Sequence, residues 1–141
     1  MTIAKKTQGL LLLFLLFGGG CARAPDEQKL RDTIAAMESA LESGEAGGFM
    51  EHVADDFSGQ QAGVDQRQLR ALLVAQTLRH EHISVLPGPL EVKLFKDRAT
   101  VKLRVLAAGG GWLPESGRQF DIESHWRIED GEWICFRADW Q

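Results

Sequence analysis

Several features are scarce in this chain of 141 residues, which has no tyrosine, two cysteines and no long hydrophobic run. The longest apolar stretch, residues 10–17, is far shorter than the roughly 20 residues that a membrane-spanning helix needs. Cys21 and Cys135 permit one disulfide at most, and none if Cys21 is modified. The absence of tyrosine excludes that side chain as a catalytic acid or base.

Basic residues are also few and scattered. The chain carries 16 Lys and Arg residues against 20 Asp and Glu residues, a net charge of −4 at pH 7, with no basic cluster or stripe. This balance argues against nucleic acid as a partner, because such proteins present a positive surface to the phosphates. The length allows one ordinary domain of about 120 residues after removal of a leader.

The first 21 residues have the pattern of a secretory signal. Lys5 and Lys6 precede the apolar run, and three glycines at 18–20 lead to Cys21. A cationic segment, an apolar core and small residues before a cleavage point are typical of such a signal. We therefore predict a signal peptide over residues 1–20, a short tether over 21–25 and one domain over 26–141.

Cys21 is the candidate lipidation site. Gly19, Gly20 and Cys21 resemble the bacterial lipobox, although Gly18 stands where Leu or Val is usual. Palmitate and other acyl chains on Cys21 would hold the protein at a bilayer, since each buried methylene contributes about 0.8 kcal/mol. Ala22 after the cysteine implies, by the same resemblance, an outer-membrane protein facing the periplasm. Ordinary secretion with an incidental cysteine is the alternative.

Apolar residues at helical spacing predict three helices, over residues 26–43, 46–56 and 65–79. Gly44 supplies a stop for the first helix. Asp65 and Gln68 form the pattern of a capping box at the start of the third helix. After His80 the apolar period changes from 3.6 to 2, which indicates strands.

The strand register follows from the side chains that must share a face. A two-residue turn at Lys96-Asp97 pairs Leu94 with Ala99 on the apolar face. For the final hairpin, a three-residue loop at 129–131 is favoured. It sets Trp126 opposite Ile134 and Ser124 opposite Phe136, whereas a two-residue turn would mix apolar and charged faces. The predicted fold class is α+β, with three helices packed on a curved antiparallel sheet.

This order resembles the nuclear transport factor 2-like superfamily, with its SnoaL-like members and cystatin-like cone. The likeness rests on five segments, residues 40–44, 54–59, 65–73, 97–101 and 126–133. The resemblance implies a cone-shaped cavity between helices and sheet, and often a dimer formed through the sheet. It does not fix the function, because the superfamily includes isomerases, dehydratases, hydrolases and non-catalytic binding modules.

Alternation along the strands and helices assigns eight residues to this cavity: Met37, Phe49, Val53, Phe57, Leu73, Ser124, Trp126 and Phe136. We find no acid among the inward strand positions, which argues against catalysis because a general base must reach its proton inside the cavity. Asp55 and Asp56 are the weak acidic candidates at the cavity mouth. His125 and Cys135 are a weak candidate for a nucleophilic pair, with an ordinary outer-face pair as the alternative.

No metal or cofactor is expected. His80 and His82 would share one face of an extended segment, but a metal site needs a third ligand and His52 lies on another element. The glycines at 109–111 are not followed by Lys and Ser or Thr, so they are no phosphate loop. Together with Trp112, Leu113 and Pro114 they are interpreted as a flexible rim of the cavity.

The outer row of the last strand is predicted to carry Trp133 and Cys135, and an exposed tryptophan on a sheet face favours an interface. We therefore expect a homodimer through that face. The leading hypothesis is a membrane-anchored, periplasm-facing, non-catalytic module whose cavity binds a small apolar ligand or a protein partner. The alternatives are a SnoaL-like isomerase, dehydratase or hydrolase, and a structural subunit of an envelope complex.

Overall fold

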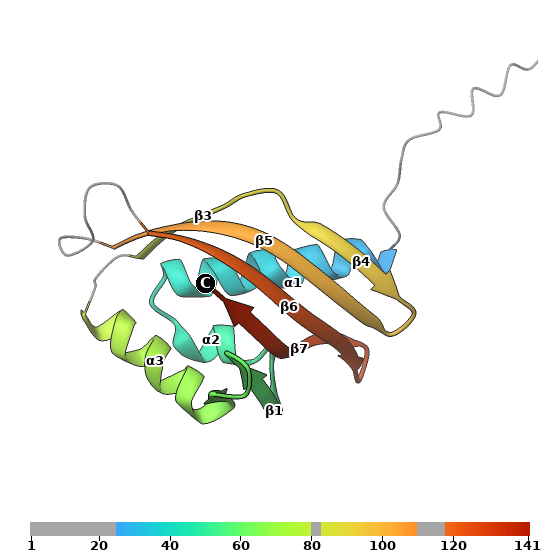
Figure 1. Cartoon of the computed structure of the whole chain (residues 1–141), viewed down its shortest axis with the longest axis horizontal. Helices are drawn as coiled ribbons and strands as arrows, with labels where there is room; N and C mark the ends of the chain where they lie inside the picture. Colours follow the sequence, from blue (N-terminus) through green and yellow to red (C-terminus); the bar gives the residue numbers. More distant parts are fainter. Residues whose placement is uncertain (1–24, 80–82, 110–117) are drawn as a thin grey trace, which may run out of the picture.

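The computed structural model describes residues 25–79, 83–109 and 118–141, which form three helices and seven strands (Figure 1). The helices lie on the concave side of one curved sheet, as predicted for an α+β cone. The elements, in chain order, are α1 (Pro25–Glu42), α2 (Ala46–Met50), β1 (Val53–Gly59), β2 (Val64–Asp65), α3 (Gln66–Arg79), β3 (Ile83–Pro87), β4 (Glu91–Phe95), β5 (Arg98–Gly109), β6 (Arg118–Glu129) and β7 (Glu132–Trp140). Among the described residues, no helix is both long and apolar enough to cross a membrane.

The sheet has the order β2-β1-β7-β6-β5-β3, and β4 pairs with the same strand β5 as β3 does. Its neighbours are antiparallel except for β1 and β7, which run parallel. The predicted curved antiparallel sheet is present, and β1, which was expected to be helical, adds one parallel pair to it. A parallel neighbour is possible here because α3 and five further strands separate β1 from β7 in the chain, which leaves room for a crossover.

The helix starts and stops follow the sequence. Gly44 has a φ of +72°, a left-handed conformation that glycine adopts without steric cost, and α1 ends just before it. At the start of α3, the backbone N–H of Gln68 donates to Asp65 Oδ1, and the backbone N–H of Asp65 donates to Gln68 Oε1, both over 2.8 Å. This reciprocal pair confirms the predicted capping box.

The second predicted helix was too long. Only residues 46–50 are helical, residues 51–52 form a turn, and residues 53–56 belong to β1. Val53 and Phe57 are both buried, and their spacing of four residues imitated a helix. The burial pattern of β1 departs from simple alternation because its pairing with β7 is irregular. Val53 pairs with Cys135 and Ser58 pairs with Arg137, so a step of five residues along β1 corresponds to a step of two residues along β7. An irregular strand thereby buries side chains at non-alternating positions.

The β4–β5 hairpin has the predicted register, with Leu94 opposite Ala99 and Glu91 opposite Lys102. The β6–β7 hairpin does not. It turns through the two residues Asp130 and Gly131, whose φ angles of +49° and +78° are those of a tight hairpin turn.

The consequence for the β6–β7 pair is a different set of partners. Trp126 lies opposite Cys135, and His125 lies opposite Arg137, so that Phe136 is an additional residue in β7. This β-bulge changes which face the later residues occupy, and it removes the objection that a two-residue turn would mix the two faces.

The core sits where α1 crosses the start of β7. Leu30 and Trp133 have no exposed surface, and Val101 of β5 is 1% exposed. The Trp133 indole Nε1 donates to the Asp26 carbonyl oxygen over 2.9 Å, which fixes the first turn of α1 to β7. Trp133 and Cys135 are thus inside the domain, and the prediction that they lie on the outer face was wrong. Dimerisation stays a prediction, without the tryptophan that suggested it.

Candidate functional site

The concave side of the sheet holds a cavity of about 500 Å³, lined by residues of α1, α2 and α3 and by the inner faces of β1, β3, β5, β6 and β7. Most of its lining is aliphatic or aromatic. Seven of the eight predicted residues line it: Met37, Phe49, Val53, Phe57, Leu73, Ser124 and Trp126. Small-molecule sites are commonly apolar hollows of about 300–1,000 Å³ with a few polar groups, so both the size and the composition fit that class.

The eighth predicted residue, Phe136, lies on the opposite face of the sheet. Its ring is covered by the guanidinium carbons of Arg98 and Arg127, at 5.2 Å and 5.3 Å from the ring centre. The His125 ring is 6.3 Å away, centre to centre. The two-residue turn is the physical reason, because it places Cys135 beside Trp126 on the cavity face and therefore Phe136 on the other face. The β-bulge then returns Ala138 to the cavity lining.

Two polar groups on the sheet side of the cavity are already engaged. Ser124 Oγ accepts a hydrogen bond from Trp126 Nε1 over 2.9 Å and lies 3.4 Å from the Val101 carbonyl oxygen, to which it donates. The Cys135 thiol donates to the Arg137 carbonyl oxygen over 3.4 Å, and burial raises its pKa to about 12. A neutral thiol of this kind is a poor nucleophile.

Glu38 and Gln76 were missed by the sequence analysis, and both line the cavity from the helical side. Glu38 follows Ile34 by four residues and precedes Leu41 by three, which places it on the same face of α1 as the apolar stripe. That spacing could have identified it. Burial, and to a lesser degree the nearby carboxylate of Glu42, raise the pKa of Glu38.

Asp55 and Asp56 do not reach the cavity. Both are exposed side chains of β1, not the end of a helix. The Asp56 carboxylate accepts two hydrogen bonds from the Arg127 guanidinium, at 2.8 Å and 3.1 Å, and these lower its pKa. Arg127 also pairs with Glu129. This cluster is an ion-pair network on the outer face, so it supplies no base to the cavity.

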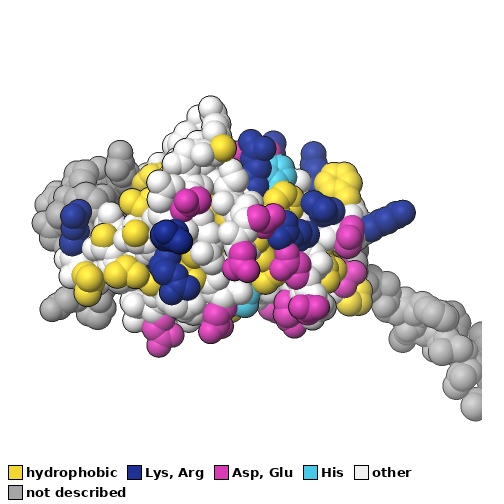
Figure 2. Space-filling view, turned by 90° about the horizontal axis from the view of Figure 1, so that it is seen from below, with side chains coloured by type: hydrophobic (Ala, Val, Ile, Leu, Met, Phe, Trp, Pro, Cys, Tyr) yellow, Lys and Arg dark blue, Asp and Glu magenta, His cyan; other side chains and the backbone are white. Residues whose placement is uncertain are grey.

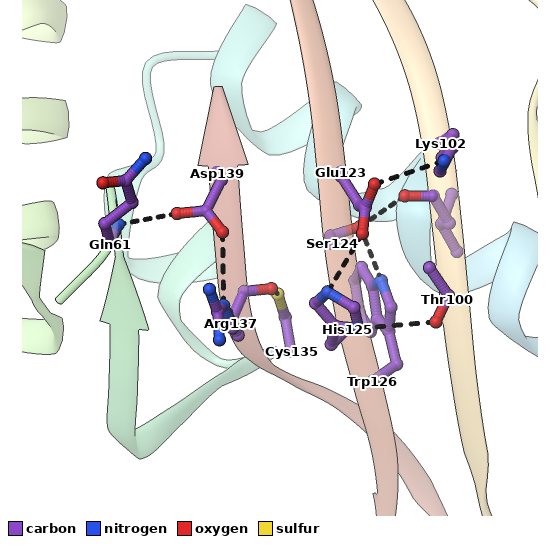
Figure 3. Close-up of polar contacts among 11 residues, drawn as sticks. Gln61, Thr100, Lys102, Glu123, Ser124, His125, Trp126, Cys135, Arg137 and Asp139 are labelled. Atoms are coloured by element: carbon purple, nitrogen blue, oxygen red, sulfur yellow. Dashed lines mark hydrogen bonds and ion pairs between the residues drawn. The ribbon is translucent and has the colours of Figure 1, made fainter. Parts of the chain in front are cut away.

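His125 and Cys135 do not form a pair. Cys135 faces the cavity, whereas His125 lies on the outer face, where Figure 3 shows it among polar neighbours. His125 Nδ1 is 3.3 Å from Thr100 Oγ1, and its Nε2 is 3.4 Å from Glu123 Oε1. Glu123 in turn pairs with Lys102. The His125–Cys135 interpretation was wrong because the two-residue turn sets Trp126, and not His125, opposite Cys135.

The described ranges contain no group of three His, Cys, Asp or Glu side chains placed to hold a metal ion. His80, His82 and the predicted rim at 110–114 lie outside the described residues. Figure 2 shows acidic and basic side chains interspersed over one face, with hydrophobic side chains gathered over the region of α3. Three hydrophobic side chains of α3 are exposed: Leu72 at 48%, Val74 at 38% and Leu78 at 82%.

No protein-family model and no curated protein matches the sequence. Solved structures do match its fold. The structure of Bd1075 from Bdellovibrio bacteriovorus matches with a TM-score of 0.72 and 12% identity over 84% of this chain. The match covers 44% of Bd1075, so this chain spans less than half of that protein's length.

Two further matches cover most of both chains. An NTF2-like protein of unknown function from Pseudomonas putida has a TM-score of 0.71 and 16% identity, over 82% of this chain and 85% of its own. A candidate dehydratase of the NTF2-like family from Streptomyces avermitilis has a TM-score of 0.70 and 16% identity, over 83% and 96%. At such identities the likeness concerns the fold alone. The chain therefore has the cystatin-like cone fold of NTF2-like proteins.

Proposed function

We propose that this protein is a lipid-anchored, periplasm-facing binding module without catalytic activity, whose cavity takes a small apolar ligand. The observation that carries the proposal is the cavity of about 500 Å³ with its largely aliphatic and aromatic lining. A structural subunit without a ligand would be expected to fill this space with its own side chains. The engaged Ser124 and the neutral Cys135 offer no nucleophile for a reaction.

Binding of the neutral dye Nile red tests the cavity. We expect its fluorescence to rise on addition of the protein, and to be lost when Leu73→Trp fills the lining from α3. Leu78→Trp is the matched control, because Leu78 is on the same helix but 82% exposed and outside the lining. Equal dye binding by the two variants would place the dye elsewhere and remove the support for an apolar ligand.

Anchoring at Cys21 is proposed from the sequence pattern of the first 21 residues, with outer-membrane placement from Ala22. Several acyl chains on one residue would give stable attachment. Growth of the expressing cells with radiolabelled palmitate should label the wild-type protein and leave Cys21→Ala unlabelled. Label that survives the substitution would contradict the anchor and leave the cavity proposal untouched.

One observation favours a second function, that of a SnoaL-like isomerase, dehydratase or hydrolase. Glu38 lines the cavity with a raised pKa, a property that suits a general acid or base. Among the matched structures, one is named as a candidate dehydratase and one as a candidate aromatic ring hydroxylase. A substrate turned over by the wild type but not by Glu38→Gln, with Nile red binding intact in both, would establish this function.

A further inference from the structure

Two polar side chains of the cavity lack a partner within the described ranges. Glu38 on α1 and Gln76 on α3 both line the cavity, and both are half-buried. Neither makes a hydrogen bond or an ion pair with another described residue. Ser124 and Cys135, the hydroxyl and the thiol of the same lining, are both engaged. The hydrogen-bonding capacity that the cavity leaves open is therefore concentrated on its helical side.

The charge around Glu38 has one sign. No Lys, Arg or His is among the described lining residues, and the nearest charged influence is the carboxylate of Glu42. Burial beside apolar walls is unfavourable for a carboxylate that has no donor to pair with. The free energy lost in this way is recovered when a ligand brings a hydrogen-bond donor with positive charge.

We propose that Glu38 and Gln76 form a head-group subsite, and that the cavity takes an amphiphile with an apolar chain and a primary amine head. This inference rests on the proposed binding function. The ammonium group donates hydrogen bonds to the Glu38 carboxylate and to the Gln76 carbonyl oxygen, while the chain lies against the apolar lining. A fatty acid of the same length is disfavoured, because its carboxylate would face that of Glu38 without a cation between them.

The test is competition for Nile red by three probes of equal chain length: dodecylamine, dodecanol and dodecanoate. The whole chain is used with Cys21→Ala, so that no acyl chain on the protein competes for the cavity. We expect the amine to displace the dye at a concentration about tenfold lower than dodecanoate, as a charge-assisted hydrogen bond warrants. Dodecanol should fall between them, since it donates without carrying charge.

Three variants assign the preference to the subsite. Glu38→Gln should reduce the difference between amine and acid to about twofold or less, and Gln76→Leu should weaken amine and alcohol together. Glu51→Gln removes the same charge from an exposed position outside the lining and should leave the preference unchanged. Circular dichroism and Nile red binding check that each variant is folded.

A carbon-13 titration of the glutamate carboxyls gives a second measurement on the protein without substitution at the subsite. Saturation with dodecylamine should lower the pKa of Glu38. Equal displacement by amine and acid, or a preference that survives Glu38→Gln, would overturn the inference while the cavity proposal stands. Failure of Nile red itself to bind would instead refute the proposed function.

Discussion

Trp126 and Ser124 are two residues apart on β6, and the indole Nε1 of the first donates to the hydroxyl oxygen of the second over 2.9 Å. Both side chains are buried on the cavity face, 3% and 7% exposed. This internal bond satisfies the indole N–H of Trp126 in the sheet wall without help from a ligand. It explains why a serine occupies an otherwise apolar row.

Replacement of Ser124 by alanine should therefore leave the Trp126 Nε1–H group buried without its acceptor. We expect a loss of about 1–3 kcal/mol in the free energy of unfolding, the cost of an unsatisfied buried donor. Urea denaturation monitored by tryptophan fluorescence measures it. Ser84→Ala, at an exposed position of β3, is the control and should change stability little. A neutral effect at Ser124 would show that water reaches the indole.

Cys135 should resist thiol reagents in the folded protein. Its pKa of about 12 and its 5% exposure leave almost no accessible thiolate at neutral pH. In the Cys21→Ala background, we expect iodoacetamide to modify Cys135 slowly in buffer and rapidly in guanidinium chloride, as followed by mass spectrometry. Fast alkylation of the native protein would indicate an activated thiol and revive a catalytic role for this residue.

The Asp56–Arg127 pair should contribute to stability in a pH-dependent way. Hydrogen bonds from Arg127 lower the pKa of Asp56 in the folded state. The contribution is thus present above the pKa of the unfolded state and is lost as the pH falls through the lower folded-state pKa.

The size of this effect is limited by exposure, because 67% of the Asp56 side chain is accessible. We expect Asp56→Asn to cost no more than about 1 kcal/mol at pH 7, and less at pH 2–3. Asp55→Asn is the control, since Asp55 makes no ion pair with another described residue. Thermal unfolding of both variants over the pH range measures the difference, and a pH-independent loss would contradict the ion-pair explanation.

Substitution of Gly131 in the β6–β7 turn should destabilise the protein. Its φ of +78° lies in the left-handed region, so Gly131→Ala should cost about 1–2 kcal/mol although a Cβ there meets no atom within 4 Å. Gly47→Ala in α2 has equal space without the positive φ, and should be neutral or stabilising. Similar effects of the two substitutions, measured by urea denaturation, would contradict the two-residue turn.

Features that depend on a single local rule could be predicted from the sequence. The Asp65–Gln68 capping box and the β4–β5 register depend on residues a few positions apart, and both are present. Features in which a long-range strand pairing changes the local burial period could not be predicted in this way. β1 imitates a helix because its register against β7 shifts between Val53 and Ser58.

The last strand carried a signal that was overlooked. The inward-facing residues of β7 have odd numbers at its start, where Trp133 and Cys135 are buried. They have even numbers at its end, where Ala138 and Trp140 line the cavity. One additional residue between the two sets accounts for this change, and it is Phe136. Glu38 was missed for a different reason, because the search for polar cavity residues followed the strands and left the helices aside.

The two walls of the cavity differ in how firmly they are held. The sheet wall contains fully buried residues such as Val101, whereas α3 has no buried residue and exposes Leu78. Displacing α3 by a small distance therefore sacrifices little buried surface, while a similar displacement of β5 or β6 would break a strand ladder. We therefore expect the sheet wall to set the shape of any ligand that enters the cavity, and α3 to be the wall that shifts when ligands differ in bulk.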